Sequence, residues 1–156
     1  MELAQTTDFI AVFIVLISLS SLIYLAIRTI ITDKHFQTGI TLYQQKDFLG
    51  AEAAFRRVIA INSTNDVVHL LLGDALMQQG KVEAAITEFQ DVIERAPKKV
   101  DAYLRLAQAL MQQKKPQQAV TVLEQAEALF QNQRQVDKAE KVQQLLDKID
   151  LSENNA

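Results

Sequence analysis

The stretch DVVHLLLGDALMQQGKVEAAITEFQDVIERAPKK, residues 66–99, decides the fold of this chain. Its apolar side chains, among them Leu72, Leu76 and Phe89, recur at spacings of three and four residues. This periodicity is typical of amphipathic helices. Gly80 separates two such segments and Pro97 closes the second, which is how helices of this length commonly end. The stretch therefore predicts a hairpin of two helices, each about a dozen residues long.

Similar segments lie 34 residues before and after this one. The shared columns are a small residue in the first helix, a small residue in the second helix, and a large apolar residue. The small residues of the first helix are Gly39, Gly73 and Ala107, and those of the second helix are Ala51, Ala85 and Ala119. The large apolar residues are Phe55, Phe89 and Leu123. One hairpin cannot bury its apolar face alone, so a period of this length predicts an all-α solenoid of stacked hairpins.

These columns resemble the tetratricopeptide repeat (TPR) family, whose 34-residue unit has small residues at positions 8 and 20, an aromatic at 24 and Pro at 32. The resemblance covers three copies without an insertion, residues 32–65, 66–99 and 100–133. Thr38, Ser63 and Gln131 depart from the family's preferred residues. The small residue at position 8 is expected where the two helices cross closest, and the large residue at 24 is expected to fill the space between hairpins.

The chain after the third copy predicts a solenoid cap. Residues 134–150 carry an apolar stripe with charges elsewhere, as expected of a helix that covers the last repeat. Residues 151–156 are expected to be a disordered tail.

Residues 9–27, FIAVFIVLISLSSLIYLAI, contain no charged side chain. A helix of that length spans roughly 28 Å, close to the hydrocarbon thickness of a bilayer. A cleaved signal peptide is one alternative, but Glu2 and Asp8 stand where its basic segment would be. A buried core helix is the other. We predict a tail over residues 1–8 and a transmembrane anchor over residues 9–31.

Orientation and continuity of this anchor depend on the residues that follow it. Arg28 and Lys34 come after the apolar stretch, and no Lys or Arg precedes it. The positive-inside tendency therefore places the repeats on the cytoplasmic side, or on a stromal side equivalent to it. A break between the anchor and the first repeat, if the chain has one, is expected at Thr32-Asp33, where a side chain could cap a helix.

Composition and motifs give no sign of an enzyme. The chain has no cysteine and a net charge of −3, which excludes thiolate catalysis and a basic surface for nucleic acid. His35 and His69 lie one repeat apart and are expected to pack at hairpin interfaces, because the nearby acids do not recur with them. The sequence predicts no catalytic residue, no metal and no cofactor. The pairs Glu52/Arg56 and Asp91/Arg95 have the spacing of surface ion pairs on a helix.

In TPR proteins the first helix of each repeat lines a concave groove. Carried onto this chain, the resemblance implies a protein-binding groove with an apolar surface and Arg105 as its main cation. Its expected residues are Phe36, Ile40, Tyr43, Leu70, Leu71, Asp74, Met77, Leu104, Arg105, Gln108 and Met111. The Lys and Asn of TPR carboxylate clamps are missing, so we expect a partner helix or extended peptide with apolar anchors. The other interpretation is that Leu70, Leu71 and Leu104 belong partly to the core.

These features together predict a non-enzymatic, membrane-tethered scaffold that helps to assemble or stabilise a membrane protein complex. Its partner is expected to be a membrane protein or an assembly intermediate of one. One anchor followed by three repeats is a layout similar to the cyanobacterial and plastid TPR family that assists photosystem I assembly, which implies a thylakoid membrane. Two alternatives remain, a permanent accessory subunit of a membrane complex and a secretion or pilus-biogenesis TPR protein with its repeats outside the cytoplasm.

Overall fold

The computed structural model describes the backbone of residues 2–154 and the surroundings of side chains 13–150. Over these residues the secondary structure consists of seven helices and no strand, which confirms the predicted all-α fold. The helices are α1 (Glu2–Gln44), α2 (Phe48–Ile61), α3 (Asp66–Gln78), α4 (Val82–Arg95), α5 (Val100–Gln112), α6 (Pro116–Asn132) and α7 (Val136–Asn154).

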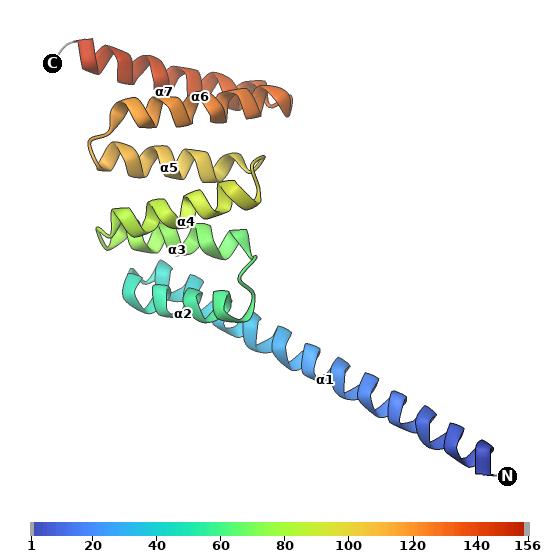
Figure 1. The fold of residues 1–156 in the computed structure, drawn as a ribbon. Coiled ribbons are helices and arrows are strands. Elements are labelled where there is room, and N and C mark those ends of the chain that lie inside the picture. Colours follow the sequence, from blue (N-terminus) through green and yellow to red (C-terminus); the bar gives the residue numbers. More distant parts are fainter. Residues whose placement is uncertain (1, 155–156) are drawn as a thin grey trace.

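The helices stack in chain order into a solenoid (Figure 1). Each helix packs on the next, so that α1–α2, α3–α4 and α5–α6 form three hairpins and α7 covers α6. The first helices α3 and α5 also touch each other, as neighbouring repeats of a solenoid do. The predicted order of three hairpins and a cap is therefore confirmed.

Helix α1 runs without a break from the apolar stretch into the first repeat. The Thr32 hydroxyl donates to the Arg28 carbonyl one turn earlier at 2.8 Å, so it lies inside the helix and caps nothing. The sequence left open whether the anchor is continuous with the first repeat, and the structure has one unbroken helix across residues 31 and 32. Because α1 begins at Glu2, it also includes residues 2–8 of the predicted tail; residue 1 lies outside the described part of the chain.

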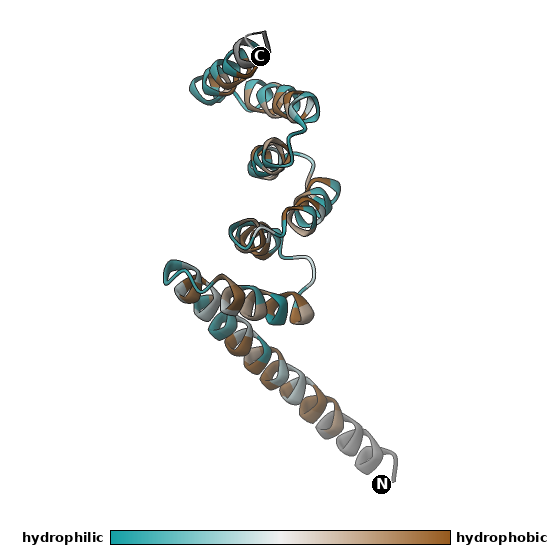
Figure 2. Cartoon of the chain, turned by 90° about the vertical axis from the view of Figure 1, so that its left-hand side faces the viewer, coloured by the Kyte–Doolittle hydropathy of each residue, from teal (hydrophilic) through white to brown (hydrophobic). Residues whose placement is uncertain are grey.

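The N-terminal part of α1 projects from the stack, and Figure 2 shows apolar residues along it. Large apolar side chains there are exposed, for example Phe13 at 66% and Ile30 at 68%. None of the most apolar window of this helix is buried in the described chain, which rules out the core-helix alternative. By length and composition the helix could cross a membrane, and a signal sequence passes the same test.

The third repeat ends differently from the first two. Helices α2 and α4 have 14 residues each, whereas α6 has 17. The second repeat has Pro97 beyond α4, while the third has Gln131 at this position, and Gln131 lies inside α6. Helix α6 instead ends at Asn132, and Arg134, two residues further on, has a left-handed φ of 57°. The cap α7 consequently begins at Val136 and continues to Asn154, through part of the predicted disordered tail; residues 155–156 lie outside the described chain.

In each of the first two hairpins a glycine lies directly against a phenylalanine ring. A Cβ at Gly39 would lie 2.5 Å from Cε1 of Phe55, and one at Gly73 would lie 2.7 Å from Cζ of Phe89. Both rings are completely buried. The ring at position 24 therefore lies against the small residue of its own hairpin, whereas the sequence analysis assigned it to the space between hairpins. The third repeat pairs a longer small residue, Ala107, with the smaller Leu123.

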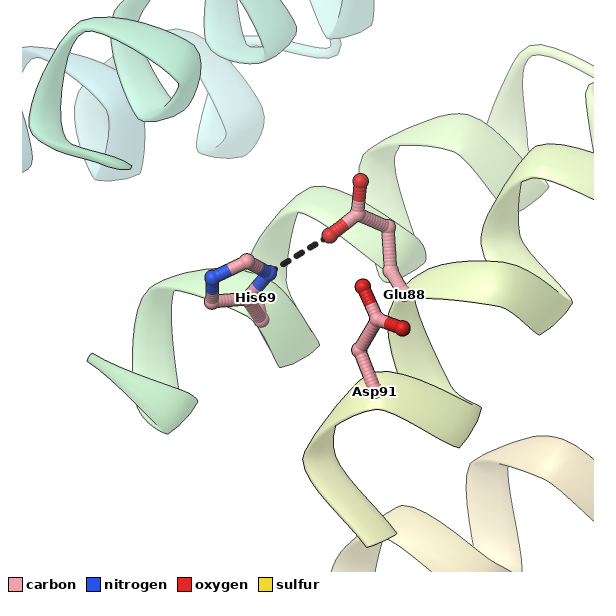
Figure 3. A group of neighbouring side chains, drawn as sticks. All are labelled: His69, Glu88 and Asp91. Atoms are coloured by element: carbon pink, nitrogen blue, oxygen red, sulfur yellow. Dashed lines mark hydrogen bonds and ion pairs between the residues drawn. The ribbon is translucent and has the colours of Figure 1, made fainter. Parts of the chain in front are cut away.

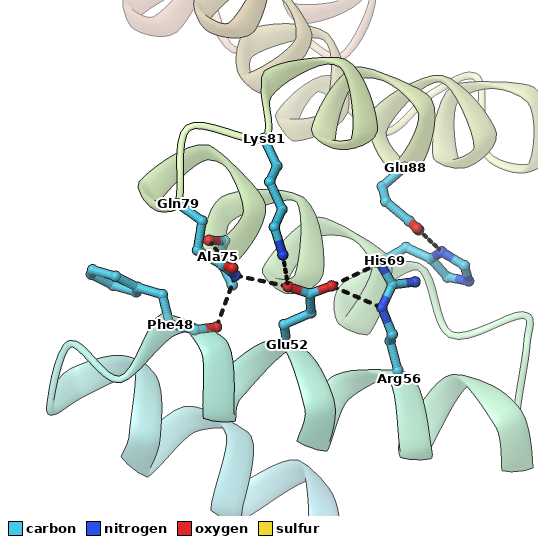
Figure 4. A network of polar contacts seen from close by, with 8 residues as sticks. All are labelled: Phe48, Glu52, Arg56, His69, Ala75, Gln79, Lys81 and Glu88. Carbon is cyan, nitrogen blue, oxygen red and sulfur yellow. Dashed lines mark hydrogen bonds and ion pairs between the residues drawn. The ribbon is translucent and has the colours of Figure 1, made fainter.

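A polar network joins the first hairpin to the second (Figure 4). Glu52 of α2 accepts hydrogen bonds from Arg56 on its own helix, and from Gln79 and Lys81 at the α3–α4 turn, the latter two at 2.9 Å each. Burial opposes ionisation of Glu52, but these three donors outweigh it and lower the pKa of Glu52 to about 2. The expected Glu52/Arg56 surface pair is thus part of a contact between repeats.

Replacing Gly73 by Ala should lower the free energy of unfolding by about 1–2 kcal/mol, because overpacking against Phe89 exceeds the gain of up to about 1 kcal/mol in helix propensity. The loss should shrink in a Phe89→Leu background, which reproduces the Ala–Leu pair of the third repeat. Urea unfolding of the full chain in detergent measures the loss of unfolding free energy caused by Gly73→Ala in each background. Equal losses in the two backgrounds would contradict the Gly–Phe contact.

Replacing Glu52 by Gln should lower the free energy of unfolding at pH 7 by about 1–3 kcal/mol, since hydrogen bonds to a charged group are lost. The pKa of Glu52 falls from 4.5 to about 2 on folding, so its stabilisation is complete above pH 4.5 and disappears as the pH falls toward 2. The difference between wild type and variant should therefore narrow across that window. Glu124→Gln, at an exposed site on α6, is the control and should show no such pH dependence.

Candidate partner-binding groove

A cavity of about 400 Å³ opens on the side of the solenoid formed by the first helices. Its lining residues are Tyr43, Asp74, Met77, Gln78, Phe89, Leu104, Arg105 and Gln108. We call this cavity the groove. All but Phe89 come from α1, α3 and α5, which is the arrangement that the TPR resemblance implies.

The repeat period explains why these side chains meet. Tyr43 and Met77 lie 34 residues apart, and so do Asp74 and Gln108. Residues three or four apart on a helix share one face, so Asp74 and Met77 point to the same side of α3. Stacking the helices then aligns equivalent positions of successive repeats along one surface.

A charged pair lies at the centre of the groove. The Arg105 Nε atom donates to both carboxylate oxygens of Asp74, at 2.9 and 3.0 Å. Burial raises the pKa of Asp74, although the Arg105 guanidinium lowers it in part. The pKa of Tyr43 is also raised, chiefly by burial and next by the Asp74 carboxylate. The groove thus combines a desolvated ion pair with apolar walls.

This pairing changes the expected role of Arg105. The sequence analysis took it as the main free cation of the groove. Its side chain is 32% exposed, but its charge is compensated by Asp74 on the neighbouring repeat. An acidic group of a partner would have to displace Asp74 to pair with Arg105, so the groove is better suited to apolar anchors than to a carboxylate.

The structure brings together six of the eleven predicted groove residues: Tyr43, Asp74, Met77, Leu104, Arg105 and Gln108. Ile40, Leu71 and Phe36 are half-buried against the core, and Phe36 lines another cavity, beside Arg28. Met111 is 40% exposed and lies outside the cavity lining.

Leu70 differs most from its predicted place. Its residue is only 4% exposed and belongs to the core cluster, so it offers little surface to a partner. This agrees with the alternative that part of the leucine set is core. Gln78 and Phe89, which are not among the eleven predicted groove residues, also line the cavity. Phe89 is completely buried, so it offers a partner no surface.

Outside the groove, one cluster contains the residue types of a metal site. His69, Glu88 and Asp91 offer ligand atoms that all lie within 4.8 Å of one another (Figure 3). The sequence analysis expected no further ligand beside the histidines, because Glu88 and Asp91 follow His69 by 19 and 22 residues and do not recur in the other repeats. It also paired Asp91 with Arg95, whereas Arg95 bonds to Asp66 at 3.2 Å.

Comparisons with known proteins agree with this architecture. A tetratricopeptide repeat family model matches residues 70–134. The TPR2B domain of yeast Sti1, solved in a pHsp70 complex, superposes with a TM-score of 0.71 at 21% identity, covering 79% of this chain and 98% of that one. The type III secretion chaperone SycD of Yersinia enterocolitica, in complex with a peptide of the translocator YopD, has a TM-score of 0.70 at 19% identity, covering 78% and 93%. No curated protein matches the chain.

These findings define the class of protein, a TPR-like α-solenoid. The family model and the TPR neighbours support the TPR family and a role in protein interaction. A TPR fold is typically a non-enzymatic interaction scaffold. The neighbours are near 20% identity, so their own partners do not transfer to this chain.

Replacing Arg105 by Met should raise the pKa of Asp74 further, because the guanidinium that lowers it is removed while the burial that raises it remains. Carboxyl ¹³C NMR titration of the full chain in detergent would measure the change. Arg95→Met is the matched control, since Arg95 pairs with Asp66 and should leave Asp74 unchanged. A lower Asp74 pKa in the Arg105 variant would contradict the pairing.

Proposed function

We propose that this protein is a membrane-tethered scaffold that binds a segment of a partner protein in the groove. One observation carries the proposal. The single helix α1 exposes an uncharged apolar surface over residues 13–27 and contributes Tyr43, near its C-terminal end, to the groove. A bare apolar surface of this extent is unfavourable in water and suits the interior of a bilayer.

The chemistry of the groove supports an apolar partner segment. Met77 and Leu104 are half-buried side chains that a partner could cover, and methionine adapts its shape to different surfaces. The compensated Asp74–Arg105 pair adds a polar centre that can set the register of a bound segment. A partner helix or an extended peptide with apolar anchors fits this combination.

The junction of α1 with α2 supports a position close to the membrane surface. A second cavity lies where α1 meets the end of α2, lined by Tyr24, Ile27, Arg28, Ile31, Ala60 and Ile61. Arg28 donates from its Nη2 to the Ile61 carbonyl. If residues 9–27 span the bilayer, the first hairpin lies at its surface and the groove one hairpin further out. Arg28 and Lys34 then favour the cytoplasmic or stromal side.

A groove held there would meet segments of membrane proteins before other partners. We therefore propose a role in the assembly or stability of a membrane protein complex. Photosystem I, in a thylakoid membrane, is the complex that the one-anchor, three-repeat layout suggests. A permanent accessory subunit would use the same groove, but it would be present in equal amount with the mature complex.

A photo-reactive amino acid in place of Met77 should crosslink the full chain to a membrane protein in membranes of the source organism. The same group in place of Leu49, which is 67% exposed on α2, is the control and should not give that adduct. The chain should stay with the membrane after an alkaline wash. Recovery of the adduct only with incomplete complexes distinguishes an assembly factor from a permanent subunit.

Met77→Asp should reduce capture of that partner at least about tenfold, because a buried interface charge costs about 2 kcal/mol or more. Thr121→Asp, on an exposed site of α6, is the control and should leave capture of the partner unchanged. Unchanged capture by a Met77→Asp chain of normal helical content would overturn the groove assignment. Release of the chain by the alkaline wash would overturn the tether.

A further inference from the structure

The cluster of His69, Glu88 and Asp91 joins the two helices of the middle hairpin. His69 lies on α3, and the two carboxylates lie one turn apart on α4 and point toward the imidazole (Figure 3). The His69 residue is 6% exposed, and the Glu88 side chain is 16% exposed. The ring is therefore buried at a place that an ion can still reach past Glu88.

The two ring nitrogens of His69 face different oxygens. Nε2 lies 3.0 Å from the carbonyl oxygen of Ser63, which can only accept a hydrogen bond, so this contact assigns the hydrogen of the neutral ring to Nε2. Nδ1 lies 2.6 Å from Oε2 of Glu88, and an ionised carboxylate also only accepts. A lone pair on Nδ1 would repel that oxygen. The contact therefore needs a positive centre, either a proton or a metal ion.

We propose that this cluster is a binding site for a divalent transition-metal ion such as Zn²⁺, held by Nδ1 of His69 and the carboxylates of Glu88 and Asp91. One imidazole and two carboxylates are a ligand set that suits such ions. The Ser63 carbonyl would act as the outer partner that fixes the ring orientation, as backbone carbonyls do for most metal-bound histidines.

The distances require only side-chain adjustment. Two atoms bound to one tetrahedral zinc at about 2.0–2.1 Å lie about 3.3 Å apart. The His69–Glu88 contact of 2.6 Å must open slightly, and the ligand atoms now within 4.8 Å must draw together. Rotation about the side-chain bonds of Glu88 and Asp91 would supply this adjustment. Asp91 is available because Arg95 bonds to Asp66.

The other repeats cannot form this site, which separates it from the general pattern of the solenoid. Thirty-four residues earlier, the three positions hold His35, Ala54 and Arg57, and 34 residues later they hold Tyr103, Val122 and Gln125. Only the middle repeat combines the histidine with two carboxylates. The repeat pattern itself therefore does not require Glu88 and Asp91.

A bound ion would fasten α3 to α4 and to the segment that precedes α3. Helix α3 carries Asp74 and Met77 of the groove, so the ion would stiffen the central wall of that surface. This inference stands apart from the proposed scaffold function, since the cluster lies outside the groove lining.

Calorimetric titration of the full chain in detergent with ZnCl₂ tests the site. We expect a single saturable Zn²⁺ per chain and a higher melting temperature in its presence. Asp91→Asn and Glu88→Gln should each weaken binding at least about tenfold, because losing even an outer-shell partner commonly costs about 10–100-fold. His35→Gln and Glu94→Gln, the second histidine and an exposed glutamate on the same helix, are the matched controls and should bind as wild type does.

Circular dichroism of each variant checks that its helices are intact, and Asp91→Asn is the primary variant because it leaves the buried ring in place. Absence of saturable binding would overturn the site and leave the His69–Glu88 contact as a hydrogen bond between side chains. Equal affinity in wild type and a folded Asp91→Asn chain would overturn the ligand assignment.

Discussion

The close approach of two helices at a glycine is the contact on which this solenoid depends. At Gly39 and Gly73 the first helix has no side chain, and a phenylalanine ring of the second helix occupies that space. Because each ring is fully buried, the distance between the helices is set by one aromatic ring. The third hairpin has Ala107 and Leu123 at the same two positions, both buried, so a larger small residue is matched by a smaller large one.

The spacing between helices also determines which side chains of the first helices meet. They are held at a regular separation, so side chains of α3 and α5 meet across the boundary between repeats. Asp74 and Arg105 form their ion pair there, on adjacent hairpins. Between the first and second hairpins, Glu52 accepts hydrogen bonds from Gln79 and Lys81 at the α3–α4 turn, so polar contacts reinforce a stack that apolar packing creates.

Helix α1 connects this stack to the apolar N-terminal segment without a hinge. Helix α1 continues through Thr32, and no helix-breaking residue stands between residues 13 and 38. A rigid connection means that any tilt of the apolar segment also tilts the groove. A scaffold on a flexible linker could search a wide volume, whereas here the continuous helix fixes the position of the groove relative to the apolar segment.

The sequence by itself determined the all-α class, the three hairpins and the cap, because these follow from a short-range pattern repeated at a constant period. It also located most of the groove, since equivalent positions align once the hairpins stack. Only the tertiary structure decided the continuity of α1, the burial of Leu70, the pairing of Arg105 with Asp74, and the meeting of His69 with Glu88 and Asp91. The contacts of Arg105 with Asp74 and of His69 with Glu88 and Asp91 join residues from 19 to 31 positions apart. They depend on how neighbouring helices are rotated and spaced relative to one another. Apolar periodicity specifies which face of a helix is buried, but it does not specify which polar side chains then come within bonding distance.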